Sequence, residues 1–454
     1  MYTDPRELLN SAAMARLQYV VIAITVALNA LDGFDVMAIS FASPGIAVEW
    51  GTTQAGLGFI LSMELWGMAA GSLLLGGVAD FLGRRPTILG CLMMMCIGMY
   101  MVTTTTSLVV LSFWRIVTGL GIGGMLASIN AMAAEYSNVK SRPMAIAVMA
   151  AGYPLGGVVG GLVVSQLLKT MDWRVVFYFG SLMTAIMIPI VFFMMPESVH
   201  WLMRKRPQNA LARINSTMTR LGHMALNVLP DISKDPKRKS IVDIFSKGML
   251  ATTLLVTAAY FLHIVTFYFI LKWVPKLVVD MGFSPSSAGG VLTWVSIGGA
   301  LGALTFGFLT RKFELKKLTL AMFVGSWITT ALFGQTTEDL FVLSALVALA
   351  GYFINAGIVG MYSIVAEVFP THVRATGTGF TVGIGRGGSA LSPIIAGFLL
   401  QGGLELPVVA IVMGTGSIMA AAALMFLRTE GGKPQGGLES GEVSASAKAV
   451  PGSV

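Results

Sequence analysis

Twelve apolar segments follow one another along this 454-residue chain, and each is long enough to cross a lipid bilayer. A helix of about 20 residues spans the hydrocarbon core, where only helices and closed barrels satisfy their backbone hydrogen bonds. Charged residues make up 11% of the chain, whereas soluble domains average about 25%. We therefore expect an all-α membrane protein with twelve transmembrane helices. The expected spans are 18–41, 55–79, 87–106, 109–133, 143–168, 173–195, 249–279, 286–310, 315–335, 339–365, 375–400 and 405–427.

The basic residues lie mainly on one side of these spans. If both termini share a side, that side holds most of the 30 lysines and arginines. Basic loops tend to stay in the cytoplasm, so we expect both termini to be cytoplasmic. The net charge of +8 then reflects membrane topology and not nucleic-acid binding. Cys91 and Cys96 lie in one span without metal-site spacing, and we expect no disulfide framework, metal or cofactor.

The two halves of the chain repeat a short pattern. Glu135 and Arg142 follow the fourth span, and Glu367 and Arg374 follow the tenth span with the same separation. Internal repeats are typical of transporters whose two halves rock around a site at the middle of the membrane. The expected organisation is a cytoplasmic N-terminus (1–17), an N-terminal six-helix bundle (18–195), a cytoplasmic linker (196–248), a C-terminal six-helix bundle (249–427) and a disordered cytoplasmic tail (428–454).

Charged residues inside three spans of the first half are the strongest functional signal. Asp32 and Asp35 lie on roughly one face of the first span, and counting from the span ends places Glu64 and Arg115 at a similar depth. Charges inside a bilayer are costly and usually functional, and a buried group of acids can take up and release protons near neutral pH. We predict that these four residues couple transport to protons. A static ion-pair network that only holds the helices together is the alternative.

Two basic side chains of the second half are candidates for anion binding. Arg386 lies near the middle of its span, too deep to reach either interface, and its own span contains no acid. A substrate carboxylate could pair with it through two hydrogen bonds, or an acid of the first half could. Lys272 is predicted to be a second carboxylate contact, or else to reach the outer lipid headgroups. His263 is interpreted as a hydrogen-bonded core histidine, with proton transfer as the alternative.

Aromatic and amide side chains near these charges are further candidates. Phe34, Trp273 and Tyr362 are predicted to contact an aromatic substrate ring, because ring stacking adds to the energy of burial. Asn355 is predicted to hydrogen-bond a ring hydroxyl. Ordinary packing between helices is the alternative for these residues.

Glycines and charges gather at the expected cytoplasmic ends of the spans. Gly76 and Gly83 permit close approach and a tight turn, and Asp80 could favour the positive end of the eleventh span near Ala375. Losing that contact would favour opening toward the cytoplasm, while the arginines could simply anchor the topology. The predicted gating residues are Gly76, Asp80, Gly83, Arg84, Arg85, Glu135, Arg142, Glu367 and Arg374.

Several of these motifs resemble those of the major facilitator superfamily. Residues 76–85 resemble its loop 2–3 signature, and Arg115 with Gly119 and Gly121 resembles its fourth-helix motif. Within that superfamily, the Asp-Gly-Phe-Asp segment 32–35 and the segment 367–377, followed by Arg386, resemble the aromatic acid:proton symporters. The resemblance covers about residues 1–430. It implies import of benzoate-like or phenylpropionate-like acids across a bacterial inner membrane.

The chain is therefore expected to be a proton-coupled symporter that imports an aromatic carboxylate by alternating access, and not an enzyme. Its expected partners are the carboxylate, protons and the lipid bilayer, and it is expected to work as a monomer. The alternatives are a sugar, polyol or other organic-anion porter, a drug exporter, or a membrane sensor that transports nothing. Two Gly-x-Gly-x-x-Gly segments lie inside spans, so they indicate helix packing and not dinucleotide binding. Residues 196–198 resemble a sugar-porter motif that is too widely shared to decide the substrate.

Overall fold

The structure is a computed structural model that describes residues 4–229, 244–246, 249–335, 339–370 and 373–427. The described residues form fifteen α-helices. They are α1 (Pro5–Ser11), α2 (Arg16–Trp50), α3 (Gln54–Leu82), α4 (Arg84–Thr103), α5 (Leu108–Glu135), α6 (Arg142–Leu167), α7 (Arg174–Met194), α8 (Val199–Lys205), α9 (Ala210–Arg220), α10 (Leu250–Asp280), α11 (Pro285–Leu309), α12 (Leu315–Phe333), α13 (Leu340–Val368), α14 (Arg374–Gln401) and α15 (Leu406–Phe426).

The long helices agree with the expected membrane spans. Eleven of the described helices are long and apolar enough to cross a bilayer. The expected span at 315–335 forms α12, which has 19 residues, carries two lysines in its first turn and packs against α13 and α15. The all-α fold is thereby confirmed, whereas the tail at 428–454 lies outside the described residues.

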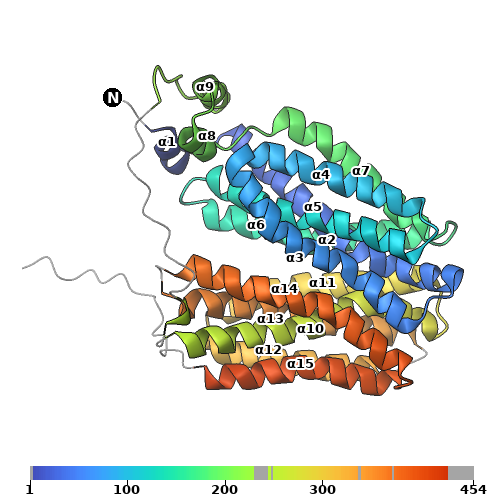
Figure 1. Cartoon of the computed structure of the whole chain (residues 1–454). Helices are drawn as coiled ribbons and strands as arrows, with labels where there is room; N and C mark the ends of the chain where they lie inside the picture. Colours follow the sequence, from blue (N-terminus) through green and yellow to red (C-terminus); the bar gives the residue numbers. More distant parts are fainter. Residues whose placement is uncertain (1–3, 230–243, 247–248, 336–338, 371–372, 428–454) are drawn as a thin grey trace, which may run out of the picture.

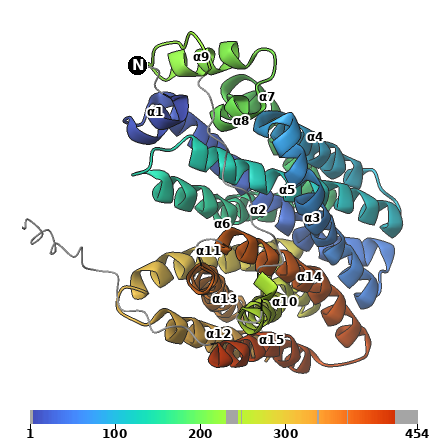
Figure 2. The same ribbon diagram turned by 60° about the vertical axis from the view of Figure 1, so that its left-hand side comes forward.

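The long helices form two groups, which Figure 1 and Figure 2 show one above the other. We call α2–α7 the N-bundle and α10–α15 the C-bundle. The N-bundle packs its first helix, α2, on its fifth, α6, and its second, α3, on its fourth, α5. The C-bundle repeats this pairing, with α10 on α14 and α11 on α13. The repeat in the sequence therefore corresponds to a repeat in helix packing.

Glycines bring these helix pairs close together. A methyl group added to Gly156 of α6 would lie 1.8 Å from the Ala30 carbonyl oxygen of α2. In the C-bundle, a methyl group added to Gly298 of α11 would likewise lie 1.8 Å from the Ala348 carbonyl oxygen of α13. Small residues at such positions allow backbones to approach, which is a main source of helix association in lipid.

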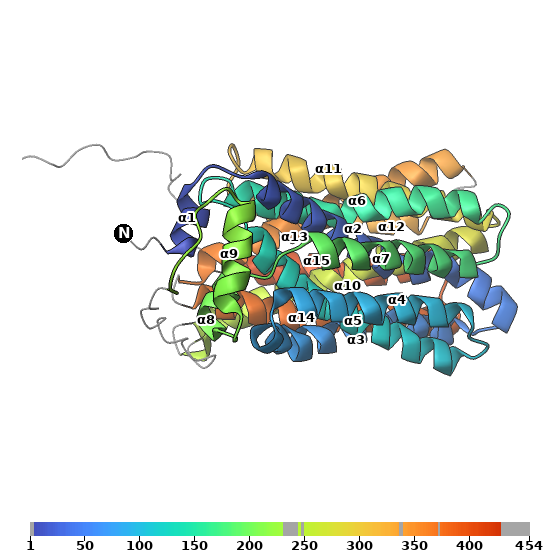
Figure 3. The ribbon, with the colours of Figure 1, turned by 90° about the horizontal axis from the view of Figure 1, so that it is seen from above.

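The two ends of the molecule differ. Helices α1, α8 and α9 lie together at one end (Figure 3), which we call the linker end. The opposite end, where α2 meets α3, is called the distal end. The polar segment 196–248 was expected only as a linker, and it contains α8 and α9. Helix α9 buries Ala210, Ile214 and Met218 on one face, a pattern that fits an amphipathic helix lying against the N-bundle.

The first long helix extends beyond its expected end. The sequence indicated a span ending near residue 41, but α2 continues through Pro44 to Trp50 and ends at Gly51, which has a φ of 56°. The depth counted for Asp32 and Asp35 from residue 41 is therefore wrong. Both aspartates lie near the middle of α2.

The two bundles touch at the distal end and at mid-height. The Ala55 N–H donates to Gln401 Oε1 at 3.0 Å, and a methyl group on Gly58 would lie 2.5 Å from the Pro393 carbonyl oxygen. Between described residues, no hydrogen bond or ion pair joins the bundles nearer the linker end than Arg386. There α3 and α14 diverge, because methyl groups added to Gly76, Gly379 and Gly383 would meet no neighbouring atom within 4 Å. The molecule is closed distally and separated along α3 and α14 at the linker end.

Candidate functional site

Asp32 and Asp35 lie buried inside the N-bundle, on the unbroken helix α2. The glycine between them, Gly33, lets α6 approach, since a methyl group there would lie 2.0 Å from the Tyr153 carbonyl oxygen. None of the four carboxylate oxygens of the two aspartates has a hydrogen-bond partner among the described residues. An ionised carboxylate in such surroundings is costly, whereas a protonated one is far less so. These two groups are therefore the acids of the site best suited to carrying protons.

Glu64 of α3, the third acid predicted at this level, is paired through its Oε2, while its Oε1 is buried without a hydrogen-bond partner among the described residues. It forms an ion pair with Arg115 of α5, and its Oε2 lies 3.4 Å from Lys272 Nζ of α10. All three side chains are fully buried. Glu64 thus joins two basic groups, one from each bundle, in a low-dielectric interior where a missing partner is strongly destabilising.

Arg115 contacts the aspartate pair only through the backbone. Its Nη2 donates to the Asp35 carbonyl oxygen at 3.0 Å, and its guanidinium lies 5.4 Å from the centre of the Phe177 ring. Arg115 therefore lies at the same level as the aspartates, as predicted, but it forms its ion pair with Glu64.

Lys272 connects the two bundles on the distal side of the site. Besides Glu64, its ammonium group donates to the carbonyl oxygen of Val36 in α2. The side chain has no exposed surface, so the alternative that it reaches the outer lipid headgroups is wrong. In this conformation its N–H groups donate to the N-bundle. A substrate carboxylate could contact Lys272 only by replacing Glu64 or the Val36 carbonyl oxygen.

Arg386 of α14 lies at mid-height against the N-bundle. Its guanidinium donates to the Met68 carbonyl oxygen at 2.9 Å and to the Ser72 hydroxyl, both on α3. No described acid lies within ion-pair distance of it, although Asp32 is near enough for the two charges to interact. Since a guanidinium has five N–H donors, most of its capacity remains for a carboxylate.

A cluster of four tyrosines lies near this arginine, and Tyr362 alone among them is a predicted substrate contact. The Tyr260 and Tyr362 hydroxyls of the C-bundle lie 3.1 Å apart, and the Tyr260 ring packs against the glycine that precedes Arg386. Tyr268 of α10 interacts electrostatically with Arg386 and with Tyr153 of α6. Tyr153 and Tyr268 therefore bring hydroxyls from both bundles to the same level. The signal that could have identified Tyr268 was its place one turn before Lys272.

The other predicted ring contacts lie within single bundles. Phe34 packs edge-on against Phe179 at 5.2 Å between ring centres. The Trp273 indole donates to the Pro393 carbonyl oxygen at 3.2 Å, and the Asn355 amide donates to Gly351 of its own helix at 3.0 Å. These contacts agree with the packing alternative in this conformation, and substrate contact by these residues stays a prediction.

His263 has the surroundings of a core histidine. Its Nδ1 lies 2.9 Å from the Ser417 hydroxyl, and its Nε2 lies 2.9 Å from the Ile354 carbonyl oxygen. Because a carbonyl only accepts hydrogen bonds, Nε2 carries the proton and Nδ1 accepts from the serine. Both ring nitrogens are satisfied, as expected for a structural role.

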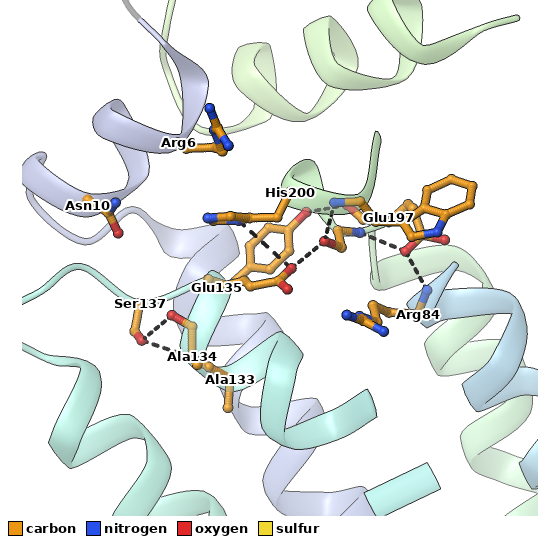
Figure 4. Close-up of polar contacts among 12 residues, drawn as sticks. Arg6, Asn10, Arg84, Ala133, Ala134, Glu135, Ser137, Glu197 and His200 are labelled. Atoms are coloured by element: carbon orange, nitrogen blue, oxygen red, sulfur yellow. Dashed lines mark hydrogen bonds and ion pairs between the residues drawn. The ribbon is translucent and has the colours of Figure 1, made fainter. Parts of the chain in front are cut away.

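Two of the predicted gating residues of the N-bundle, Arg84 and Glu135, take part in a polar network at the linker end (Figure 4). Its centre is Glu197, which belongs to the sugar-porter-like motif at residues 196–198 but was not predicted as a gating residue. Oε1 of Glu197 accepts the backbone N–H groups of Arg84 at 2.8 Å and Ser198 at 2.8 Å, so the carboxylate caps the start of α4. Gly83 makes this possible, since its φ is 107° and a methyl group there would lie 2.4 Å from Glu197 Oε2. Burial raises the pKa of the Glu197 carboxyl, while these hydrogen bonds act to lower it.

Glu135 joins the same network from the end of α5. It accepts a hydrogen bond from the Ser198 hydroxyl, and its Oε2 lies 3.9 Å from His200 Nδ1. Burial lowers the pKa of His200 below its usual value. Glu135 is thus tied to the segment that follows α7 and not to Arg142.

Arg142 and Arg374 have equivalent roles in the two bundles. The Arg142 Nε donates to the Ala134 carbonyl oxygen at 2.9 Å, at the end of α5. The Arg374 Nε donates to the Phe369 carbonyl oxygen at 3.2 Å, directly after α13. Each arginine caps the helix that precedes its own, which gives the sequence repeat a structural meaning.

The remaining gating residues are apart from the opposite bundle. Asp80 pairs with Arg84 one turn later at 2.8 Å, and Glu367 is exposed. The expected contact of Asp80 with the start of α14 is not made between described residues, in agreement with the separation of the bundles there. Its formation in another conformation stays a prediction.

Comparisons with known proteins agree with this architecture. Residues 25–277 and 256–451 match the family model described as Major Facilitator Superfamily. The chain is 26% identical over 428 residues to a gallate transporter of Pseudomonas putida, covering 93% of this chain and 94% of the relative. It is 28% identical over 404 residues to the 4-hydroxybenzoate transporter PcaK of Acinetobacter baylyi, covering 87% and 88%.

Among solved structures, a D-xylose-proton symporter has the same fold, with a TM-score of 0.71 at 16% identity. This likeness covers 90% of the present chain and 97% of the other. The family and the relatives named above are transporters, in agreement with the expectation that the chain is not an enzyme. Because the family model matches most of its length, the chain belongs to the Major Facilitator Superfamily.

Proposed function

We propose that this protein imports an aromatic carboxylate together with protons by alternating access of its two bundles. The observation that carries the proposal is the mid-height site, where the described residues leave two carboxylates of the N-bundle unpaired at the level of an arginine without an acid partner. The relatives named for gallate and 4-hydroxybenzoate, both hydroxylated benzoates, support this class of substrate. The linker end carries most of the basic residues, which supports a cytoplasmic linker and termini in a bacterial inner membrane. We propose that the protein acts as a monomer.

Arg386 is the proposed anion site. A substrate carboxylate would replace the Met68 carbonyl and the Ser72 hydroxyl as the partner of the guanidinium, gaining a charge-assisted pair in place of two neutral bonds. Tyr153 and Tyr268 supply hydroxyls and ring faces at the same level, which suits a hydroxylated aromatic ring.

Asp32 and Asp35 are the proposed proton carriers. Both are buried without hydrogen-bond partners in a conformation closed at the distal end, so closing is favoured when they are protonated. Opening the site to water would allow them to release the protons. This difference between states links proton binding to the direction in which the site opens.

The ion pair between Lys272 and Glu64 is the proposed distal gate. It joins the C-bundle to the N-bundle on the side that is closed, and Arg115 holds Glu64 in position from behind. Opening the distal side must separate Lys272 from Glu64 and from the Val36 carbonyl oxygen. In this proposal the structure corresponds to the state that opens toward the cytoplasm.

The charge carried per cycle decides which energy source drives uptake. A monovalent carboxylate with one proton moves no net charge, so only the pH gradient contributes. A second proton would add about 2.3 kcal/mol per 100 mV of membrane potential. With two aspartates, the site could carry either one or two protons per substrate.

Uptake into proteoliposomes tests the proposal directly. With an acidic outside, we expect the purified protein to accumulate at least one member of a panel of benzoates, hydroxybenzoates and phenylpropionates. Collapse of the pH gradient by an ionophore should abolish accumulation. Accumulation of xylose but of no aromatic acid would contradict the proposal, as would efflux under the same gradient.

In the same vesicles, Asp32→Asn and Asp35→Asn should each abolish accumulation against a gradient while leaving exchange of external for internal substrate partly intact. The amide cannot carry the proton but fits the same space. Asp172→Asn, at an exposed aspartate outside the site, is the matched control and should accumulate normally. Normal accumulation by both site variants would exclude the proton role.

Arg386→Ala should weaken binding of benzoate-type acids by about 10- to 100-fold, because a hydrogen-bonded charge pair is lost. Binding of the corresponding amides, measured by calorimetry on the same preparations, should change little. Arg386→Lys keeps the charge and should recover part of the loss. An equal loss for acids and amides would mean that Arg386 has a structural role.

Lys272→Gln should raise the fraction of molecules that are open at the distal side. In a background without Cys91 and Cys96, Thr293→Cys places a reporter in the closed distal interface, where Thr293 is 2% exposed. A membrane-impermeant maleimide added outside the cells should label it roughly tenfold faster in the Lys272→Gln variant, a shift typical of a coupling energy near 1.4 kcal/mol.

The control for this change is Lys276→Gln. Lys276 lies one turn later on α10 and pairs with Asp280 of its own helix, without crossing to the N-bundle. Its removal should leave labelling unchanged. Equal labelling rates for the two lysine variants would show that Lys272 does not hold the distal end closed.

A further inference from the structure

A pocket lies at the linker end, away from the mid-height site around Asp32 and Arg386. It has a volume of about 400 Å³ and lies between the end of α7, the start of α4 and helix α9. Three arginines line it, Arg85 from α4 and Arg213 and Arg220 from α9. Glu197 is the only acid among its lining residues in the described chain.

The arginines retain unused hydrogen-bond donors. Arg85 donates to the Phe192 carbonyl oxygen, but its Nε is buried without a partner among the described residues. Arg220 makes a long hydrogen bond of 3.4 Å to the Met194 carbonyl oxygen, and Arg213 lies 3.9 Å from Glu197. Each guanidinium has five N–H groups, so the pocket has a surplus of donors.

The pocket also has a surplus of positive charge. Among the described lining residues Glu197 is the only counter-charge, and its Oε1 already accepts the backbone N–H groups at the start of α4. Three basic groups therefore face one carboxylate, of which only Oε2 remains, 3.9 Å from Arg213. Arginines brought together around a cavity are typical of binding sites for phosphate, which accepts paired N–H groups.

The pocket adjoins the lipid-facing surface of the N-bundle. Phe193 lines it and is 75% exposed, and the neighbouring Phe192 and Met194 are also exposed on the last turn of α7. Since α7 is a membrane span, its last turn lies where acyl chains give way to headgroups. A phosphate that is attached to acyl chains would thus fit both the charged and the apolar side of the pocket.

Capping of α7 explains only part of this arrangement. Arg85 and Arg220 both donate to carbonyl groups at the end of that helix, as basic residues often do at a helix C-terminus. Arg213 makes no such contact in the described structure, and its guanidinium points to the same cavity. Capping does not require the third arginine.

We propose that this pocket binds a phosphate group, supplied by an anionic phospholipid of the cytoplasmic leaflet, between Arg85, Arg213 and Arg220. The bound headgroup neutralises the three arginines and holds α9 against the ends of α4 and α7. The site is independent of the transported substrate, because it shares no residue with the site around Asp32 and Arg386.

The test compares full-length protein with the variant Arg213→Gln/Arg220→Gln, in detergent. Phosphatidylglycerol, phosphatidylcholine and inorganic phosphate are titrated separately, and the rise in the thermal unfolding midpoint is measured. We expect phosphatidylglycerol to stabilise the wild type at concentrations where phosphatidylcholine does not. The double variant should require roughly 30-fold more phosphatidylglycerol, because each basic residue near a membrane surface contributes about a fivefold gain in affinity. Native mass spectrometry should show correspondingly less retained phosphatidylglycerol.

The control is Arg311→Gln/Lys312→Gln, which removes the same charge from two exposed residues after α11. It should respond to phosphatidylglycerol like the wild type. If the double variant does not fold, Arg220→Gln alone, at an exposed side chain, should still show a roughly fivefold weaker response. Equal responses of wild type and pocket variants would overturn the proposal, as would an equal loss in the control. If inorganic phosphate stabilised the wild type as much as the lipid does, and the pocket variants lost this response, the pocket would bind phosphate. The proposal that a phospholipid supplies the phosphate would then be overturned.

Discussion

The ion-paired group of Arg115, Glu64 and Lys272 is the interaction on which the rest of the molecule depends. Three fully buried charges, two from the N-bundle and one from the C-bundle, meet around a single carboxylate. Such a group is stable only while all its members are present, because removal of one leaves an uncompensated charge in a low-dielectric interior. The conformation closed at the distal end therefore depends on the contact between Lys272 and Glu64, and opening that end requires this contact to break.

The charges around it divide into paired and unpaired groups. Glu64 has two basic partners, while the neighbouring carboxylates of Asp32 and Asp35 have no hydrogen-bond partner in the described structure. Arg386 is bonded only to neutral groups of α3. In the proposed cycle, Glu64 and its two basic partners keep the distal end closed. Asp32 and Asp35 carry protons, and Arg386 binds the substrate.

Much of the site could be read from the sequence because charges in apolar spans are rare. Composition and span length predicted the helices, and the position of Arg386 within its span placed it at mid-height. Asp32 and Arg115 were placed together at one level, but nearer the outer end, because the first span was expected to end near residue 41 whereas α2 continues to Trp50. The partners were harder to predict. Depth along a helix does not give the direction of a side chain, so Lys272 was assigned to substrate or headgroups while it bonds to Glu64. The motif at residues 196–198 was set aside because it is too widely shared to decide the substrate, and it does not indicate that Glu197 caps α4.

The sequence by itself determined the membrane class, the helical repeat and the residue types of the site, since these follow from hydropathy and from the cost of charge in lipid. Only the tertiary structure decided which charges pair, which side is closed and where α9 encloses a basic pocket. It also showed that α2 continues through Pro44 to Trp50, beyond the span end that hydropathy predicted near residue 41. The physical reason is that pairing and closure depend on how helices distant in sequence are rotated and packed, and hydropathy carries no such information.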